Sequence, residues 1–427
     1  MAILLIFGIL IASLALSIPI GIGLGLSTAL TIAMTTNTPL VMIAQNCFAS
    51  LDSFPLLAIP FFMLAGTLMG SGGISRRLVG FCNGLVGHFI GGLGKVTVAA
   101  CMFFAAISGS GPATVSAIGS FMIPAMRAQS YKPGFAAALV AAAGTIGVII
   151  PPSIPFVLYG VVASVSVGEM FLAGVVPGII IGVALMTVTH IIAKRDKYPV
   201  MSKEDRNESN TCSFREAFWA LMIPVIILGG IYGGIFTPTE AAAVGSAYAI
   251  IIGKFVYKEL DFKMLWSAFR DAALVNGSTS YMVGFSSSFA VFLTMAQIPA
   301  KIGAALLSVS DSKILILLLI NALLLVVGCF VDNLSSMIIL TPILLPIVTK
   351  LGMDPVHFGL VMTCNLAIGF VTPPYGANLF VSSAISGINT IEISRNILPM
   401  IAAMLICLLL FTFVPSLSMG LVTLLLR

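Results

Sequence analysis

Two segments of this chain repeat each other 222 positions apart, and each contains a Pro-Pro pair within a hydrophobic stretch. The pair at 151–152 corresponds to the pair at 373–374, and Pro133 corresponds to Pro355. Proline removes a backbone donor and interrupts an α-helix, so each copy predicts a broken helix at the same place. Duplicated membrane proteins with matching helix breaks are typical of secondary transporters, in which substrate binds where the broken segments meet.

The amino-acid composition also indicates a membrane protein. Of the 427 residues, 59% are hydrophobic and 8% are charged, whereas a soluble domain has about 25% charged residues. Apolar runs long enough to cross a bilayer as helices occur throughout the chain. We therefore expect an all-α polytopic membrane protein. The expected crossings, in approximate bounds, are 2–16, 18–35, 54–70, 133–160, 168–193, 217–236, 237–253, 277–297, 355–385 and 396–418.

One polar stretch divides the chain into two halves. Residues 194–216 hold 11 of the 35 Asp, Glu, Lys and Arg residues, and we expect them to form a cytoplasmic connector between a first repeat, 1–193, and a second repeat, 217–427. Sixteen of the 20 Lys and Arg residues then lie on the cytoplasmic side, as the positive-inside rule predicts. In this topology the two repeats are inverted relative to each other and both termini lie outside. The net charge of +5 is then a topology signal and does not indicate nucleic-acid binding.

Each repeat contains a predicted hairpin followed by a broken helix. The segments 94–127 and 316–350 each have two apolar arms of about 15 residues around a small or polar tip, which is short for full crossings of about 20 residues. We therefore expect re-entrant hairpins whose tips are buried in protein or line a cavity. The broken helices are expected at 133–160 and 355–385.

The second half also contains a strong helix start. Thr237 is followed by Pro238 at the first helical position and by Glu240 three residues after Thr237. This is the pattern of a capping box. We therefore interpret Glu240 as a structural residue, although it is a carboxylate beside the membrane.

The hairpin tips and broken helices predict two sodium sites. Adjacent prolines leave carbonyl groups one turn earlier without N–H partners, which is costly in hydrocarbon. Sodium is a hard cation that prefers carbonyl and hydroxyl oxygens. The alternative is that the prolines only kink the helices and that neighbouring Ser and Thr side chains complete the hydrogen bonds. The first expected site uses Ala106, Ser108, Gly147, Ile150 and Ser153, and the second, related by the repeat, uses Gly328, Gly369, Thr372 and Tyr375.

Asp332 is the most unusual residue of the predicted tips, because an acidic side chain inside a membrane is costly and is a functional candidate by default. It either contacts substrate hydroxyl groups or caps the tip by accepting hydrogen bonds from the Leu334 and Ser335 amides. Free N–H groups at the half-helix starts would attract an anionic group of the substrate. The residues expected to contact substrate between the tips are Ser110, Thr114, Asp332, Asn333, Ser335 and Asn378.

Four motifs resemble a known family. They are Ser-Gly-Ser-Gly-Pro-Ala-Thr at 108–114, Gly-Ile-Phe-Thr-Pro-Thr-Glu-Ala-Ala at 234–242, Leu-Thr-Pro-Ile-Leu-Leu-Pro at 340–346 and Thr-Pro-Pro-Tyr-Gly-Ala-Asn at 372–378. The similarity covers nearly the whole chain and is to the large membrane subunit (M, or DctM-like) of TRAP (tripartite ATP-independent periplasmic) transporters. The detailed sequence looks closest to sialic acid (N-acetylneuraminate) M subunits, and C4-dicarboxylate members share the motifs. The resemblance also implies the positions of the second sodium site.

The resemblance implies Na⁺-driven import of an organic acid across the bacterial inner membrane. In the topology expected from the charges, both termini are then periplasmic. The resemblance also implies an elevator mechanism, for which we expect a transport domain of 94–160 plus 316–385 and a scaffold formed by the remainder. The implied partners are a periplasmic substrate-binding protein (P), a small membrane subunit (Q) and membrane lipid. We expect Q to be a separate chain, because this chain starts directly at the M segment. Na⁺ is the expected coupling ion, and no organic cofactor is expected.

Three other functions fit the sequence less well. An ATP-driven pump needs a nucleotide site, but Gly94-Lys95 is followed by Val96 and lacks the upstream glycine of a P-loop. An intramembrane serine protease, the enzyme alternative, would need Ser286 beside His357, and their predicted helices give no reason for contact. An ion channel stays open as an alternative, because selectivity filters also use backbone carbonyls. Inverted halves with paired hairpins favour alternating access.

Overall fold

The computed structural model describes residues 2–16, 18–198, 203–302, 312–373 and 376–427. For 203–213 it describes the backbone only. Within these ranges the ordered elements are all helices, with no strand. Seven described helices are long and apolar enough to cross a bilayer. The predicted all-α polytopic membrane fold is therefore confirmed.

The first half contains one helical hairpin and one broken helix, as predicted. The hairpin is α6–α7, which turns at Gly109 with φ of +62°, a left-handed conformation that suits glycine. The broken helix consists of α8, the short helix η2 and α9, and the Pro-Pro pair at 151–152 lies in the gap before α9. The bounds are α1 (Ala2–Ala15), α2 (Ile20–Thr35), α3 (Val41–Leu51), η1 (Phe54–Leu57), α4 (Ala58–Ser71), α5 (Ile74–Val86), α6 (Gly92–Ser108), α7 (Gly111–Ala128), α8 (Pro133–Gly144), η2 (Thr145–Val148), α9 (Ile154–Val162) and α10 (Val167–Arg195).

The second half repeats this order of elements. The hairpin is α15–α16 and the broken helix is α17–α18, and both ends of α16 lie 222 positions after those of α7. The inverted orientation of the repeats stays a prediction. Re-entry also stays a prediction, because α15 and α16 are each long enough to span a bilayer. The bounds are α11 (Lys203–Tyr232), α12 (Pro238–Ile251), η3 (Ile252–Val256), α13 (Phe262–Met295), α15 (Lys313–Phe330), α16 (Asn333–Lys350), α17 (Pro355–Gly369), α18 (Ala377–Ser386), α19 (Thr390–Phe413) and α20 (Ser416–Leu425).

Local side-chain caps explain where several helices begin. The predicted capping box is confirmed at α12, where the Thr237 hydroxyl accepts from the Glu240 N–H and a Glu240 carboxylate oxygen accepts from the Thr237 N–H at 2.8 Å. Ser153 caps α9, and Asp354 caps α17 by accepting from two backbone amides. Each cap satisfies N–H groups that a helix start leaves unpaired.

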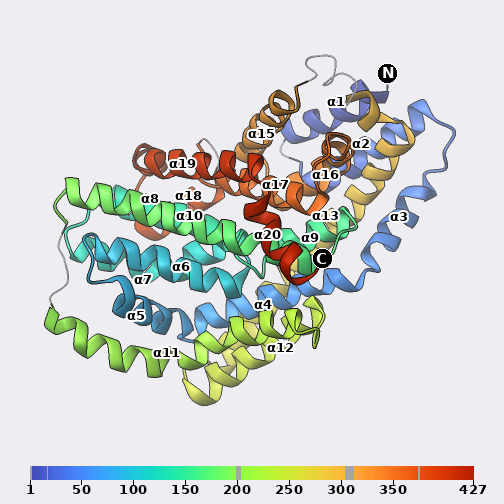
Figure 1. Cartoon of the computed structure of the whole chain (residues 1–427). Helices are drawn as coiled ribbons and strands as arrows, with labels where there is room; N and C mark the ends of the chain where they lie inside the picture. The colour runs from blue at the N-terminus through green and yellow to red at the C-terminus, as the bar shows by residue number, and fades with distance from the viewer. Residues whose placement is uncertain (1, 17, 199–202, 303–311, 374–375) are drawn as a thin grey trace.

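The helices form two packed groups. Figure 1 shows α8, α10 and α19 side by side, and these helices pack with the first hairpin, with both broken helices and, through α10, with α20. The second hairpin joins this group through its contacts with α9 and α17. The other group consists of α1 to α5 and α11 to α13, with α4 against α12 and α13 against α2 and α3. The expected transport domain did not include α10, α19 or α20, although these helices lie against it. Packing does not measure motion, so the boundary between moving and fixed parts stays a prediction.

Helices α3, α5 and α20 lie outside the predicted crossings and hairpins. Helix α3 packs against α13, and α20 packs against α10. Each is shorter than the roughly 20 residues of a crossing, so a search by span length does not find them. Helix α13 also begins at Phe262, well before the predicted start at residue 277.

Candidate functional site

The first hairpin tip is hydrogen-bonded to the neighbouring helix break. Ser108 Oγ lies 3.0 Å from Thr114 Oγ1, and the Thr114 hydroxyl donates to the Ser110 carbonyl at 2.8 Å. The Ile154 N–H donates to the Gly109 carbonyl at 3.2 Å and so joins α9 to the tip. Ser108 and Thr114 are buried. The tip therefore holds a compact group of neutral oxygen atoms inside the protein.

Gly147 brings the broken helix against this oxygen group. A Cβ at Gly147 would lie 2.5 Å from Thr114 Oγ1 and 2.6 Å from the Ser110 carbonyl oxygen. Glycine therefore permits an approach that a larger residue would block. Pro151 has no N–H to offer the Gly147 carbonyl one turn earlier, so this carbonyl lacks its regular helical partner beside the tip.

The other residues predicted for the first site differ in their surroundings. The Ser153 hydroxyl donates to the Val148 carbonyl at 2.6 Å, so one carbonyl at the break is satisfied by a side chain, as the kinked-helix alternative predicted. The Ile150 side chain lies against Gly178 of α10. Ala106 lies in the last turn of α6. Ser108 and Gly147 therefore both lie beside the Thr114 hydroxyl. The ligand roles of all five predicted residues stay predictions.

The second tip and break meet at two glycines. A Cβ added to Gly369 would lie 2.5 Å from the Gly328 carbonyl oxygen and 2.6 Å from its Cα. Beyond this contact the Thr372 N–H donates to the Gly369 carbonyl at 3.1 Å, and the Thr372 hydroxyl donates to the Ile368 carbonyl at 2.7 Å. Three of the four predicted residues therefore lie around one break. The fourth, Tyr375, lies outside the described residues.

The broken helices of the two repeats are bonded to each other crosswise. Asn378 Nδ2 and Ser382 Oγ of α18 donate to the Ala141 and Ala137 carbonyls of α8, at 3.1 and 2.7 Å. The Tyr159 hydroxyl of α9 donates in turn to the carbonyl of Pro355, the first residue of α17, at 2.7 Å. The second half of each broken helix is thus fixed to the first half of the other.

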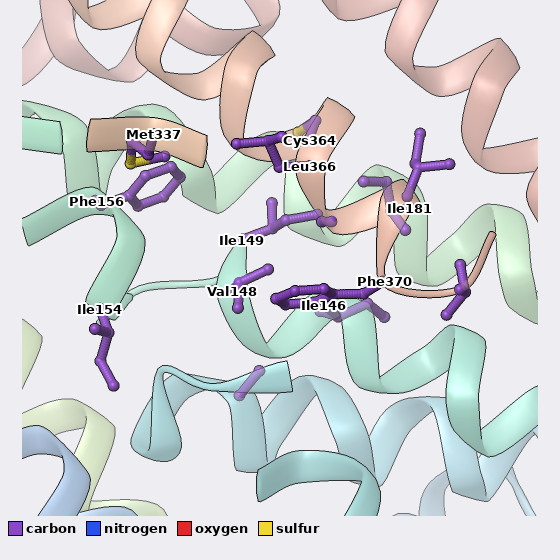
Figure 2. Packing of buried hydrophobic residues seen from close by; sticks show 14 of the residues in the cluster. Ile146, Val148, Ile149, Ile154, Phe156, Ile181, Met337, Cys364, Leu366 and Phe370 are labelled. Atoms are coloured by element: carbon purple, nitrogen blue, oxygen red, sulfur yellow. The ribbon is translucent and has the colours of Figure 1, made fainter. Parts of the chain in front are cut away.

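Buried apolar side chains surround the breaks. Ile146, Val148 and Ile149 of the first repeat and Leu366 and Phe370 of the second belong to one buried hydrophobic cluster. Figure 2 shows these side chains gathered at the break between η2 and α9. Hydrogen bonds in such a low-dielectric region are strong, and unpaired polar groups there are costly.

A cavity of about 500 Å³ lies between the two tips. Ser110, Asp332 and Asn333, three of the six residues predicted to contact substrate, line it. Asn333 is 1% exposed, and neither atom of its amide group has a hydrogen-bond partner within the described part of the chain. A buried amide that lines a cavity without a partner is available to a ligand.

The two tips differ electrostatically. Asp332 caps α16, and its carboxylate accepts from the Leu334 N–H at 3.0 Å while also lining the cavity. The cap interpretation is therefore confirmed for Leu334, and the same side chain lines the cavity. Ser110, the residue before α7, makes no side-chain cap hydrogen bond. The α7 start therefore favours an anionic group, whereas the α16 start already has a carboxylate.

Three predicted substrate residues do not line the cavity. The Thr114 hydroxyl bonds within the first tip, and the Ser335 hydroxyl donates to Met282 Sδ at 2.8 Å. Asn378 Nδ2 bonds to α8, and its Oδ1 has no hydrogen-bond partner among the described residues. These residues hold the walls of the site in this conformation.

Sequence reasoning missed a polar wall of the cavity on α13. Ser278, Thr279 and Tyr281 line it together with the tips, as does the start of α2 around Ile20. The signal was the run Gly-Ser-Thr-Ser-Tyr at 277–281, which stands out in an apolar span. The imagined protease pair does not form, because the Ser286 hydroxyl donates to its own helix and His357 Nδ1 lies 2.6 Å from Ser418 Oγ.

The fold resembles that of solved membrane transporters. The Alcanivorax borkumensis YdaH transporter aligns with a TM-score of 0.65 at 12% identity and with 88% coverage of both chains. The Neisseria gonorrhoeae MtrF structure aligns with a TM-score of 0.56 at 14% identity, covering 87% of this chain and 83% of that one. At these identities the likeness concerns the fold. The described helices, seven of which are long and apolar enough to cross a bilayer, define the class as an all-helical membrane fold.

The sequence comparisons define the family. Residues 7–417 match the model of the tripartite ATP-independent periplasmic transporter, DctM component, and the chain belongs to this family. It is a transporter permease and not an enzyme.

Three of the curated relatives are named as permeases for different acids. The isethionate TRAP transporter permease protein DctMQ of Oleidesulfovibrio alaskensis is 49% identical over 91% of this chain, which spans 61% of that relative's length. The C4-dicarboxylate large permease DctM of Rhodobacter capsulatus is 39% identical with full coverage of both chains. The sialic acid large permease SiaM of Vibrio cholerae is 39% identical over 91% of each chain.

Proposed function

We propose that this chain is the large membrane subunit of a Na⁺-coupled TRAP transporter that imports an organic acid by an elevator mechanism. The observation that carries the proposal is the 500 Å³ cavity between two hairpin tips, each packed against a helix break. Family membership supports transport as the function. Coupling of substrate import to sodium entry requires a substrate site next to cation sites, and the paired tips and breaks offer both.

The proposed sodium sites are the two tip-and-break junctions. At the first, the hydroxyls of Ser108 and Thr114 and the carbonyl of Ser110 are neutral oxygens close to Gly147. A hard monovalent cation suits such a set, whereas a soft metal prefers thiolate or imidazole. The second junction, at Gly369, is its counterpart in the repeat.

The proposed substrate site uses both tips and the α13 wall. The anionic group of the substrate binds at the uncapped α7 start beside Ser110, and its neutral polar groups bind Asn333 and Asp332. Sialic acid was the expected substrate. The higher identity to the isethionate permease, 49% against 39% for SiaM, favours a small hydroxy acid such as isethionate.

The proposed moving body is larger than the sequence indicated. Asn365 Nδ2 of α17 donates to Asn321 Oδ1 of α15 at 2.8 Å, and Asn321 Nδ2 donates to Thr412 Oγ1 of α19 at 3.0 Å. Breaking buried polar bonds within a membrane is costly, so α19 moves with the hairpin and the broken helix. Helices α10 and α20 pack on the same body. The fixed body is then α1 to α5 with α11 to α13.

The proposed assembly has three parts in the bacterial inner membrane, with both termini periplasmic. A periplasmic binding protein delivers the substrate, and a small Q subunit packs against the fixed body within the lipid. The name of the fused DctMQ relative supports a Q-type partner for this chain.

Site variants in reconstituted vesicles test this proposal. Thr372→Val should weaken the sodium dependence of uptake, and Asp332→Asn should strongly reduce uptake without loss of folded protein. Thr187→Val is the matched control, because Thr187 makes the same hydroxyl bond to its own helix on an exposed face of α10. Unchanged sodium dependence in Thr372→Val would remove the second site. Normal uptake by Asp332→Asn would remove Asp332 from the substrate site.

A further inference from the structure

A small basic recess lies where three helices of the proposed moving body end together. It has a volume of about 200 Å³ and lies between the start of α8, the end of α10 and the first turns of α19. Figure 1 shows these three ends close together at one side of the molecule. Its polar lining consists of Lys132, Arg195, Asp196, Arg395 and Asn396.

The recess is lined by three basic side chains and one acidic side chain, so its lining carries a positive charge. Lys132 Nζ lies 2.8 Å from Asp196 Oδ2, and Arg195 Nε lies 3.1 Å from Asp196 Oδ1. The Lys132 ammonium, followed by the Arg195 guanidinium, holds the pKa of Asp196 below its ordinary value, so this carboxylate stays ionised. Arg395 lines the same recess, and no hydrogen bond or ion pair to it occurs in the described ranges. Glu392 lies nearby against Gly134 of α8, and three cations still outnumber two acids.

The floor of the recess is apolar. Phe135 and Ile192 are buried there, and Pro399 of α19 completes the wall. The recess lies at the end of α10, which is long and apolar enough to span a bilayer. A charged rim above an apolar floor, at the level where a spanning helix leaves the membrane, matches a phospholipid headgroup with its glycerol and upper chain.

We propose that this recess binds a phosphate group, with Arg395 as its main contact and Lys132 and Arg195 at its rim. Guanidinium groups bind phosphate oxygens through paired hydrogen bonds. The bound group is the phosphate of an anionic phospholipid headgroup or free inorganic phosphate, since both present the same oxygens. The site joins α8, α10 and α19 at one membrane surface and is separate from the substrate cavity.

The proposal is tested with the complex of the full chain and its small subunit, purified and depleted of lipid. Binding of phosphatidylglycerol, phosphatidylcholine and inorganic phosphate is measured by native mass spectrometry and by the shift in melting temperature. Arg395→Gln should weaken phosphatidylglycerol binding about tenfold or more, because it removes a charge-assisted contact. Arg395→Lys should retain part of it. The control is Arg270→Gln, an exposed arginine of α13 that pairs only with Asp271 in the described structure.

The three probes distinguish the sources. Tighter binding of phosphatidylglycerol than of phosphate, lost in Arg395→Gln, identifies a lipid site. Equal binding of free phosphate, lost in the same variant, identifies a phosphate-ion site. Equal affinity of Arg395→Gln and wild type for both anions overturns the proposal, as does equal binding of phosphatidylcholine and phosphatidylglycerol. Melting of the variant without added ligand shows whether it is folded.

Discussion

Substitution of Gly369 by alanine tests the second tip-and-break junction directly. The added Cβ would lie 2.5 Å from the Gly328 carbonyl oxygen and 2.6 Å from its Cα, where ordinary van der Waals contact begins at 3.4 Å. The opposing atoms belong to the backbone, so α15 and α17 must separate by about 1 Å. Overpacking of this kind costs about 1–3 kcal/mol.

That strain falls on the proposed sodium ligands. If it acts on cation binding alone, a cost of about 1–3 kcal/mol weakens the affinity about 5- to 150-fold, since about 1.4 kcal/mol is a factor of ten. We therefore expect the sodium concentration for half-maximal uptake to rise by a factor in this range. Sodium-dependent uptake into proteoliposomes measures it, and the melting temperature with and without sodium measures the same binding without transport.

Gly420→Ala is the matched control for this prediction. Gly420 lies in α20 and has no atom within 4 Å of an added Cβ, so alanine there should leave uptake unchanged. Wild-type sodium dependence in Gly369→Ala, with an unchanged melting temperature, would refute the reasoning. It would show that the two glycines are not pressed together in the working protein.

Three further perturbations follow from the described contacts. Asn321→Ala removes two buried side-chain hydrogen bonds and leaves Asn365 without one of its acceptors. It should therefore lower the free energy of unfolding by about 1–3 kcal/mol, measured in a thermal melt. Arg427→Gln removes two half-exposed ion pairs, including one to Asp354, and should cost less than about 1 kcal/mol, with a difference that disappears in high salt. Two cations lower the pKa of Asp196, so its stabilising contribution is present above an ordinary aspartate pKa of about 4 and is lost as the pH falls through the lowered value. Asp196→Asn should therefore melt below wild type at neutral pH, and the difference should narrow in acid.

The positions of the helix pairs and of the helix breaks could be predicted because proline and glycine impose local constraints. Adjacent prolines interrupt a helix wherever they occur. Once the first hairpin and break are located, the 222-position offset predicts where the second hairpin and break lie. The same offset relates the observed bounds of α7 and α16. The capping box at Thr237 was readable for the same reason, since its partners are three residues apart.

The packing of α10 and α19 could not be predicted, because it depends on contacts between distant segments. The hydrogen bond between Asn321 and Thr412 joins residues 91 positions apart. Asn321 is conspicuous in its apolar span, but the sequence does not show which distant residue it contacts. The cavity wall at Ser278 was missed for a similar reason, because serine in a membrane helix more often serves close packing. Only the tertiary structure shows which such residues face a cavity.

Uptake driven by a sodium gradient alone tests the central claim most directly. The complete system is reconstituted in vesicles with its Q subunit and binding protein, with labelled substrate at equal concentration on both sides. Sodium is then added outside only. We predict accumulation above the external concentration, which collapses when sodium is equalised by an ionophore. Equilibration of substrate without accumulation would indicate a channel, and accumulation that is independent of sodium would contradict the proposed coupling.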